Sequence, residues 1–409
     1  MNFICAYEHC TACCACLNIC PKSAIKLEEK GPLGFFHPTI DQSLCIDCGL
    51  CEKICPVNHP VTLNKPISSY AVTCKNESEV KASASGGAAY ALSKKILEDG
   101  GVVYGCEMED YRTIKHCRYT TEHDMERMRG SKYVQSNIGL ILKSVKDDLM
   151  RGNKVLFTGT PCQVAGLKSF LRKDYDNLYT VDLVCHGVPS QKLLREDIES
   201  ILDQQGISIP VGLKVHFREK RLSKNAKLDI KYGVFFDENM SLLGQEFLRN
   251  NYITSFMSCL TIRDNCYTCV YAQARRCSDI TVADYWGLGD NCVVNRQNGI
   301  SLLLPSTKKG VSLLNASKKF MLWQERTVEE AINGNGRLMS PSVVPINRQS
   351  FIQDYQCYGV KAYDKHLKKY RKEYVRKEKL TSFVKEHPFY ALPIRFYWKI
   401  SRLLSKVIS

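Results

Sequence analysis

Short apolar runs alternate with amphipathic segments along the middle of the chain, between about residues 67 and 355. The apolar runs are rich in β-branched residues, which predicts buried strands, and the amphipathic segments repeat apolar residues at helical spacing. Because strands and helices alternate, the pattern predicts an α/β domain with a mainly parallel sheet. The predicted strands are 102–104, 154–157, 179–184 and 300–304, and the predicted helices are 88–98, 138–150, 164–171 and 192–202.

Composition divides the chain into three regions. Residues 1–62 are dense in cysteine, and proline-containing sequences near residue 60 are typical of a linker. Residues 67–355 carry the alternating pattern, although the stretch 212–236 favours antiparallel strands. Residues 356–409 form a basic, aromatic tail that we expect to be helical. We therefore expect a small α+β domain, the α/β domain and a helical tail with these bounds.

The positive charge of the chain is concentrated in the tail. The net charge is +15, and the segment from Tyr363 to Ser409 contributes +9 of it, from 13 Lys and Arg against 4 Asp and Glu. The body therefore carries little excess charge, which argues against a broad nucleic-acid-binding face, and we expect no nucleic-acid partner.

The end of the tail has the pattern of an amphipathic helix. Basic residues recur at spacings of four, three and four among apolar and aromatic residues, which suits contact with an anionic membrane surface. A helix docked on the body with a solvated charged face is the alternative. The basic residues of this stripe are Arg395, Lys399, Arg402 and Lys406.

The compartment bears on how the 21 cysteines are used. No run of about 18 apolar residues occurs, and the first residues lack the pattern of a secretory signal. We therefore expect a cytoplasmic protein, with the tail allowing attachment at the inner face of the membrane. Thiols stay reduced in the cytoplasm, so clustered cysteines favour metal binding over disulfides.

Two cysteine runs in residues 1–62 share the spacing Cys-x2-Cys-x2-Cys-x3-Cys-Pro. In such a run three thiolates bind one iron–sulfur cube, and the fourth cysteine, which precedes proline, binds the other cube. Zinc sites also use Cys-x2-Cys pairs, but two complete runs favour two [4Fe-4S] clusters in a ferredoxin-like domain. We expect one cluster at Cys10, Cys13, Cys16 and Cys55, and the other at Cys20, Cys45, Cys48 and Cys51.

Three segments of the large domain carry residues suited to a second redox site. Ser85-Gly86-Gly87 precedes a predicted helix, where small residues allow backbone N–H groups to approach a phosphate, although a plain helix N-cap has the same pattern. Cys162 and Cys185 each follow a predicted strand, and the carboxyl ends of parallel strands meet at one edge of a sheet. A third site would be completed by Cys266-x2-Cys269; buried structural cysteines are the alternative.

Taken together, these segments resemble the coenzyme F420 hydrogenase/dehydrogenase beta-subunit family, in its bacterial branch with a fused N-terminal ferredoxin domain. The resemblance covers residues 1 to about 320 and rests on five motifs in the same order. They are Ser85-Gly86-Gly87, Arg129-Gly130-Ser131-Lys132-Tyr133-Val134-Gln135, Gly159-Thr160-Pro161-Cys162-Gln163, Cys185-His186-Gly187-Val188-Pro189 and Asp279-Ile280-Thr281-Val282-Ala283-Asp284-Tyr285-Trp286-Gly287.

The resemblance implies two cofactors in the large domain. A third [4Fe-4S] cluster would be held by Cys162, Cys185, Cys266 and Cys269, with Cys259 as the main rival for one place. FAD would lie against Ser85, Gly86 and Gly87, with Ser131 and Lys132 nearby. Lys132 would stabilise the negative charge of the reduced flavin, and His186 would donate a proton beside the substrate; a solvated lysine and a structural histidine are the alternatives.

The expected function is therefore that of an iron–sulfur flavoprotein oxidoreductase. It would pass electrons between a redox donor such as ferredoxin, its own clusters and an FAD that acts on an organic substrate or a deazaflavin coenzyme. The alternative is a non-catalytic electron-transfer subunit that feeds a partner enzyme. A zinc protein that binds nucleic acid through the tail is the third hypothesis. Bacterial members of the family accompany enzymes of surface-polysaccharide synthesis, a context that the resemblance alone implies.

Overall fold

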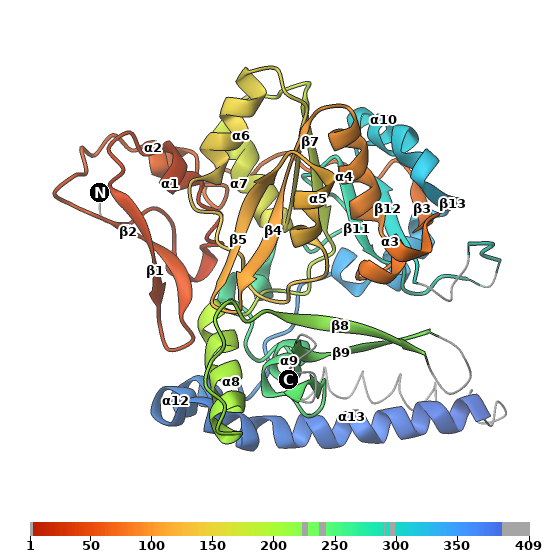
Figure 1. Cartoon of the computed structure of the whole chain (residues 1–409). Helices are drawn as coiled ribbons and strands as arrows, with labels where there is room; N and C mark the ends of the chain where they lie inside the picture. Colours follow the sequence, from red (N-terminus) through yellow and green to blue (C-terminus); the bar gives the residue numbers. More distant parts are fainter. Residues whose placement is uncertain (1–2, 223–227, 237–242, 290, 295–298, 387–409) are drawn as a thin grey trace.

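The computed structural model describes residues 3–222, 228–236, 243–289, 291–294 and 299–386 (Figure 1). Its centre is a mixed sheet that, within the described residues, has eight strands. Across the sheet the strands are β13 (Met321–Arg326), β3 (Ser69–Cys74), β12 (Ser301–Pro305), β11 (Ile280–Asp284), β7 (Leu178–Leu183), β6 (Val155–Gly159), β4 (Val102–Asp110) and β5 (Thr113–Tyr119).

The parallel pairs lie in the middle of this sheet. β4 pairs with β6, β6 with β7, and β7 with β11, all in parallel. The predicted strands 102–104, 154–157 and 179–184 correspond to β4, β6 and β7. The predicted strand 300–304 corresponds to β12, which runs antiparallel to both of its neighbours, β11 and β3. An apolar run indicates burial on both faces of a sheet but carries no information about direction.

Helices cover both faces of the sheet, and alternate residues of each strand point to opposite faces. Leu156 of β6 packs in the core under α4 (Ala88–Glu98) and α10 (Lys308–Ser317). Val155 and Phe157 pack on the other side with α6 (Ile141–Met150) and α7 (Pro161–Leu171). The bounds of α4 are those that the apolar pattern predicts. Shorter helices complete this part: α3 (Glu77–Ala82), α5 (Glu122–Met125) and α11 (Val328–Gly334).

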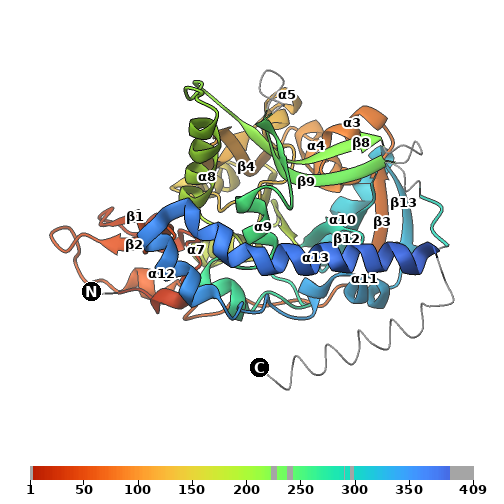
Figure 2. The same ribbon diagram turned by 90° about the horizontal axis from the view of Figure 1, so that it is seen from below.

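A second core lies below the central sheet, as Figures 1 and 2 show. Its hairpin of β8 and β9 pairs antiparallel, as the stretch 212–236 predicts. Four helices pack around the hairpin. The elements are β8 (Val215–Leu222), β9 (Leu228–Phe236), β10 (Gln245–Glu246), α8 (Gln191–Gln204), α9 (Asn251–Met257), α12 (Arg348–Tyr358) and α13 (Ala362–Glu386).

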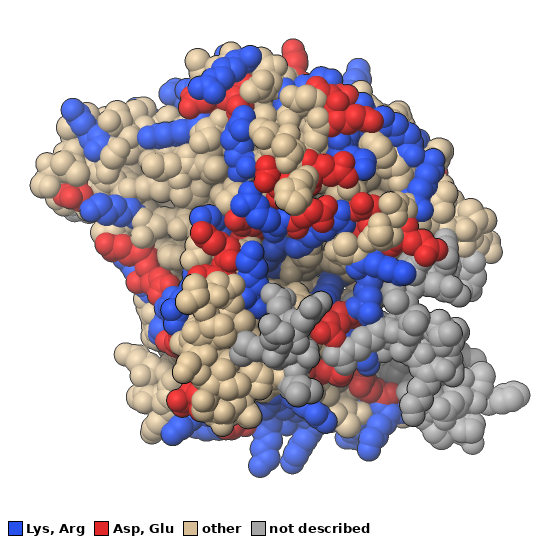
Figure 3. Space-filling model, viewed as in Figure 1, with Lys and Arg blue, Asp and Glu red and all other residues tan. Residues whose placement is uncertain are grey.

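The helix α12 runs across residue 356, where the sequence predicts that a separate tail begins. Phe351, Tyr355 and Tyr363 are buried in the second core, so their aromatic rings join α12 and α13 to the body. Lys and Arg side chains project along the edge of the molecule where α13 lies (Figure 3). The stripe from Arg395 to Lys406 lies outside the described residues. Within those residues, no helix is long and apolar enough to span a membrane.

The cysteine-rich N-terminal segment packs beside the α6 and α7 face (Figure 1). Gly166 of α7 shows how close this contact is, because a Cβ atom there would lie 2.5 Å from Cβ of Cys13. β1 and β2 pair as an antiparallel hairpin that connects the two cysteine runs. The elements of the segment are α1 (Ala15–Ile19), β1 (Ile25–Lys30), β2 (Phe35–Ile40) and α2 (Leu50–Lys53).

Candidate functional site

The structure brings the thiols of Cys10, Cys13, Cys16 and Cys55 together at the buried side of the N-terminal segment. The pKa of Cys16 is raised well above its usual value, chiefly by burial and then by the negative charges of neighbouring thiols, among them the other three of this set. Burial raises the pKa of Cys13, and the charges of Cys55 and Cys10 add to this rise. Cys55, the last cysteine of the second run, therefore lies with the first three cysteines of the first run, whereas Cys45, the first cysteine of the second run, lies elsewhere.

Cys14 and Cys5 also lie close to this set. The Cys14 thiol, which lies out of phase with the run, is buried and donates a hydrogen bond to the carbonyl oxygen of Ala12 at 3.5 Å. The pKa of Cys5 is raised by hydrogen bonding to Cys10 and Cys55 before burial contributes. Sequence reasoning missed Cys5 because it lies outside the repeated spacing.

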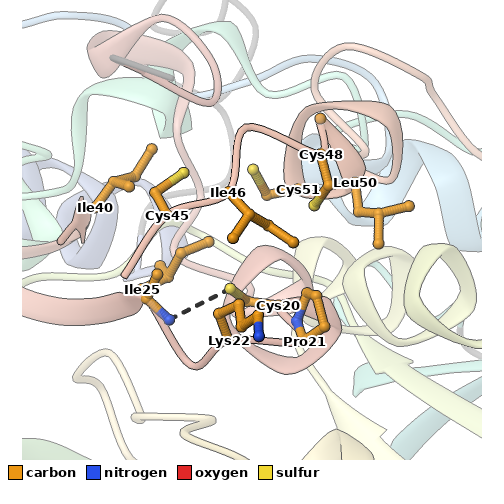
Figure 4. Close-up of a pocket in the computed structure, with 12 residues that line it drawn as sticks. Cys20, Pro21, Lys22, Ile25, Ile40, Cys45, Ile46, Cys48, Leu50 and Cys51 are labelled. Atoms are coloured by element: carbon orange, nitrogen blue, oxygen red, sulfur yellow. Dashed lines mark hydrogen bonds between the residues drawn. The ribbon is translucent and has the colours of Figure 1, made fainter. Parts of the chain in front are cut away.

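The other four cysteines of the two runs surround a small cavity of about 20 Å³ (Figure 4). The backbone N–H of Ala24 donates a hydrogen bond to Sγ of Cys20 at 3.3 Å, and hydrogen bonds to sulfur are one determinant of a cluster's reduction potential. Cys48 is exposed, so this site lies at the surface. The cysteines that line the cavity are Cys20, Cys45, Cys48 and Cys51.

A third group of thiols lies at the carboxyl edge of the parallel strands. Cys162 is the second residue of α7 after β6, and Cys185 follows β7. Cys266 and Cys269 come from the loop around the 3-10 helix Asp264–Thr268. Burial raises the pKa of Cys162 to about 12, and the charges of Cys269 and Cys185 add to this effect. Cys266 feels the charges of all three others, so the four thiols share one buried space.

Cys259 and Cys277 take other partners. Sγ of Cys259 lies 3.3 Å from Nε2 of His186. Burial raises the pKa of Cys259, and a hydrogen bond with Ser342 and the charge of Arg337 partly offset this rise. Cys277 is buried and donates to the carbonyl oxygen of Pro161 at 3.3 Å. The structure therefore groups the four expected cysteines and gives Cys259 a histidine partner.

Each of the three groups offers four thiols, which is the ligand set of a [4Fe-4S] cluster. A zinc site needs its thiolates within about 2.3 Å of one ion, whereas a four-iron cube accepts more widely spaced thiolates. Within the described residues, no group of three or more His, Cys, Asp or Glu side chains is placed to hold a metal ion. The thiol groups fit a cluster, and the zinc hypothesis gains no support.

A cavity of about 510 Å³ opens beside the third thiol group. This volume lies within the range of about 300–1,000 Å³ that is typical of cofactor and ligand pockets. The cavity brings together residues of the predicted flavin site with residues of the third thiol group. They include Ser85, Gly87, Ser131, Lys132, Cys162, Cys185 and His186.

The two glycines before α4 have different roles. Gly86 does not line the cavity in this structure; a Cβ there would lie 2.4 Å from the carbonyl oxygen of Val72, so the residue allows close packing on the sheet. Gly87 lines the cavity and is the N-cap of α4, with a φ of +86° that favours glycine. The hydroxyl of Ser85 donates to the carbonyl oxygen of Ile300 at 2.9 Å. The helix therefore begins at the cavity wall.

Several polar groups that line the cavity are buried and have no hydrogen-bond partner in the described structure. They are Nη1 of Arg129 and the hydroxyl groups of Thr158 and Thr11. A buried polar group without a partner is costly, and a ligand with phosphate and hydroxyl groups would satisfy it. The start of α4, with its free N–H groups, adds a second anion-favouring feature. The residues around the cavity thus fit a phosphate-bearing cofactor such as FAD.

Lys132 and His186 both line this cavity, and both have tertiary partners. The Lys132 ammonium donates to the carbonyl oxygens of Met128 and Arg129, each at 2.7 Å, which leaves one of its three N–H donors for a ligand. Burial lowers the pKa of Lys132. Nε2 of His186 lies 3.2 Å from the carbonyl oxygen of Phe256, and burial lowers the pKa of His186 to about 4, with the charge of Arg337 acting in the same direction. Its imidazole is therefore neutral at pH 7.

The hairpin of β8 and β9 contributes cavity residues that sequence reasoning missed. Arg218 forms a two-pronged ion pair with Asp284, with N–O distances of 2.9 and 2.7 Å, and its guanidinium lies over the rings of Tyr133 and Tyr232. His116 also lines the cavity, where its ring nitrogens lie 3.0 Å from the Thr158 carbonyl oxygen and the Ser136 hydroxyl. No local pattern marks these residues, because the fold alone brings them together.

Comparison with known proteins gives two family matches. Residues 152–330 match the C terminus of the coenzyme F420 hydrogenase/dehydrogenase beta subunit, and residues 9–59 match the 4Fe-4S dicluster domain. The first match contains the third thiol group, and the second contains both cysteine runs. The two clusters expected from the runs are therefore supported, whereas the third cluster and FAD stay predictions.

Individual relatives match parts of the chain. An uncharacterized protein of Methanocaldococcus jannaschii is 27% identical over 204 residues, covering 42% of this chain and 55% of its own length. The coenzyme F420-dependent sulfite reductase of the same organism is 24% identical over 235 residues, covering 52% of this chain and 36% of its own length. The chain thus spans about half or less of these curated relatives.

A solved chain of the F420-reducing [NiFe] hydrogenase complex from Methanosarcina barkeri matches at 17% identity with a TM-score of 0.40, covering 75% of this chain and 93% of that chain. The family matches agree with the order of motifs along the sequence. The chain thus joins a segment that matches the 4Fe-4S dicluster domain to a segment that matches the C terminus of the coenzyme F420 hydrogenase/dehydrogenase beta subunit.

Proposed function

We propose that this protein is an iron–sulfur flavoprotein oxidoreductase that passes electrons between ferredoxin-type clusters and an FAD that reduces or oxidises an organic substrate or a deazaflavin coenzyme. The observation that carries this proposal is the 510 Å³ cavity, because Ser85, Gly87 and Lys132 line it together with Cys162 and Cys185. A cofactor in this cavity would lie beside the third thiol group.

Each thiol group would hold one [4Fe-4S] cluster, and the cavity would hold FAD. When bound, clusters supply one-electron transfer and a flavin converts between one- and two-electron chemistry. Gly87 and the start of α4 would receive the phosphates, and Arg129 would pair with their charge. Lys132 would direct its remaining N–H at the flavin. His186 is neutral at pH 7, so it would act as a hydrogen-bond donor or acceptor at the cavity wall.

The order of the three thiol groups in space supports transfer toward the cavity. The group that includes Cys48 lies at the surface, where a donor such as ferredoxin could contact it. The group that includes Cys13 is buried against α7 at Gly166, one helical turn after Cys162. The buried Tyr271 packs in one core cluster with Cys13 of the first group and with Cys162 and Cys269 of the third.

A non-catalytic electron-transfer subunit is the second candidate, and Trp286 is the observation that favours it. Trp286 lines the cavity and is 53% exposed. Exposed aromatic side chains are enriched where proteins bind partners. Turnover of reduced coenzyme F420 with an artificial electron acceptor by the isolated chain would favour the enzyme, and electron transfer that requires an added partner protein would favour the subunit.

Titration of FAD into anaerobically purified protein tests the cavity assignment. Arg129→Gln should weaken FAD binding at least tenfold, because its buried Nη1 is offered to the cavity. Arg127→Gln is the matched control, since Arg127 lies in the short helix that ends just before Arg129, is half exposed and is not part of the cavity wall. Equal FAD affinity for the two variants, or no FAD binding by the unmodified protein, would contradict the assignment.

A further inference from the structure

Arg263 joins the N-terminal segment to the loop that carries Cys266 and Cys269. It precedes that loop's 3-10 helix, and its side chain is only 2% exposed. Its Nε donates to the carbonyl oxygen of Cys10 at 2.7 Å. Nη2 donates to Nε2 of His37 at 3.0 Å. One side chain thus contacts the segment of the first thiol group while its backbone belongs to the third.

The remaining contacts of Arg263 are neutral as well. Nη1 donates to Oε1 of Gln135 at 3.3 Å, and the guanidinium lies over the ring of Phe35, 5.5 Å from its centre. His37, stacked on Tyr7, is itself uncharged, because the guanidinium can only donate and the ring nitrogen that faces it must therefore be unprotonated. The guanidinium is held tightly by hydrogen bonds, but none of these partners balances its charge.

Two other buried arginines nearby have carboxylate partners, which makes Arg263 unusual. Arg276 lies 3.0 Å from Asp182, and Arg348 lies 2.6 Å from Asp264. Among the residues that the structure describes, no Asp or Glu lies within ion-pair distance of Arg263. A buried charge without a counter-charge is strongly destabilising, so a negative partner is expected.

Arg263 lies directly beside two of the thiol groups. Its Nε contacts the backbone of Cys10, and its own carbonyl oxygen accepts a hydrogen bond from the backbone N–H of Cys266 at 3.0 Å. Cys10 belongs to the first group and Cys266 to the third. The guanidinium therefore lies where the N-terminal segment meets the large domain, next to both groups.

We propose that Arg263 is a positioning residue whose buried charge is balanced by the negative charge of the clusters held by the first and third thiol groups, and that it raises the reduction potential of at least one of them. This inference rests on the proposed function. Reduction adds one electron and one negative charge to a cluster, with no proton taken up, and a fixed positive charge nearby stabilises that added charge. Arg263 thereby favours the arrival of the electron at the domain junction.

The same charge links cluster loading to docking of the N-terminal segment. With clusters present, Arg263 has counter-charges on both sides of the junction. Without them, it is a buried cation with neutral partners only, and separation of the segment from the large domain would return it to water. The protein with clusters should therefore hold the N-terminal segment more firmly than the protein without them.

Redox titration followed by electron paramagnetic resonance tests this proposal on the full chain purified without oxygen. Arg263→Gln removes the charge and keeps a hydrogen-bonding side chain of similar reach. It should shift the reduction equilibrium of at least one internal cluster at least tenfold toward the oxidised form, about 59 mV for a one-electron couple. Arg263→Lys keeps the charge and should stay within about threefold of the unmodified protein.

Arg348→Gln is the matched control, because it removes another buried guanidinium beside the same loop whose charge is already paired with Asp264. It should leave the potentials unchanged. Unchanged potentials in Arg263→Gln, or equal shifts in Arg348→Gln, would overturn the proposal. If Arg263→Gln fails to retain iron, retention of iron and potentials by Arg263→Lys supports the proposal, and loss of both overturns it. Absence of flavin in the unmodified protein would contradict the proposed function but leave this test intact.

Discussion

The contact between Gly166 and Cys13 gives a sharp test of how the N-terminal segment meets the large domain. Gly166→Ala would place a Cβ atom 2.5 Å from Cβ and 2.8 Å from Sγ of Cys13. Carbon atoms pack best at about 3.5–4.0 Å, so either α1 or α7 would have to move by about 1 Å. The perturbation is directed at one thiol of the first group.

Two opposing terms set the size of the effect. Gly166 lies within α7 and has no positive φ, so alanine should favour the helix itself by about 1 kcal/mol. Forcing an extra carbon atom into a closely packed contact costs about 1–3 kcal/mol. The net loss of stability should be at most about 2 kcal/mol, so the protein should fold while the first thiol group is distorted.

Iron analysis and limited proteolysis read out this distortion. The variant should lose up to about four irons per chain, the content of one cluster, and should be cut faster near the linker at residue 60. Gly336→Ala is the matched control, because a Cβ there meets nothing within 4 Å. If Gly166→Ala retained as much iron as Gly336→Ala and resisted proteolysis equally, the close docking of α1 on α7 would be refuted.

Three further predictions concern the thiols and one buried carboxyl group. Cys55→Ser should remove the same paramagnetic signal as Cys10→Ser, and Cys20→Ser the same signal as Cys45→Ser. If Cys55→Ser instead removed the same signal as Cys45→Ser, and Cys20→Ser the same signal as Cys10→Ser, the grouping of the thiols would be wrong. Cys266→Ser should lose about four irons per chain while Cys259→Ser keeps them, and iron loss in Cys259→Ser alone would reverse the assignment. Asp197 is buried, and desolvation raises its pKa to about 6. Between about pH 4 and 6 the native chain therefore binds more protons than the unfolded chain, so stability falls by about 3 kcal/mol as pH rises through this window. Thermal unfolding of Asp197→Asn across this range should lack that fall, and parallel profiles for the two proteins would contradict the assigned pKa.

Local patterns predicted the parts of the site that depend on spacing. The repeated cysteine runs encode which thiols share a site, because the fourth cysteine of each run, which precedes proline, is turned away from the first three and toward the other site. The carboxyl-edge argument placed Cys162 beside Cys185, since β6 and β7 are parallel neighbours. The apolar repeat predicted the bounds of α4 because its buried face is continuous.

Long-range packing decided what the patterns could not predict. The direction of β12 depends on its neighbours, and its apolar residues suit either direction. Arg218 and Tyr232 reach the cavity from a hairpin that folds back below the sheet, so no spacing in the sequence relates them to Asp284. The basic helix α13 is anchored by Tyr363, which is buried among aromatic residues of α12 despite the surrounding charge.

Cofactor content is the measurement that tests the central claim most directly. The full chain should be purified without oxygen, and its iron, sulfide and flavin should be determined per chain. Three thiol groups of four cysteines and one cavity predict about twelve irons, as three [4Fe-4S] clusters, and one FAD. Eight irons and no flavin would contradict the account, because the clusters of the N-terminal segment would then lead to no redox site in the large domain.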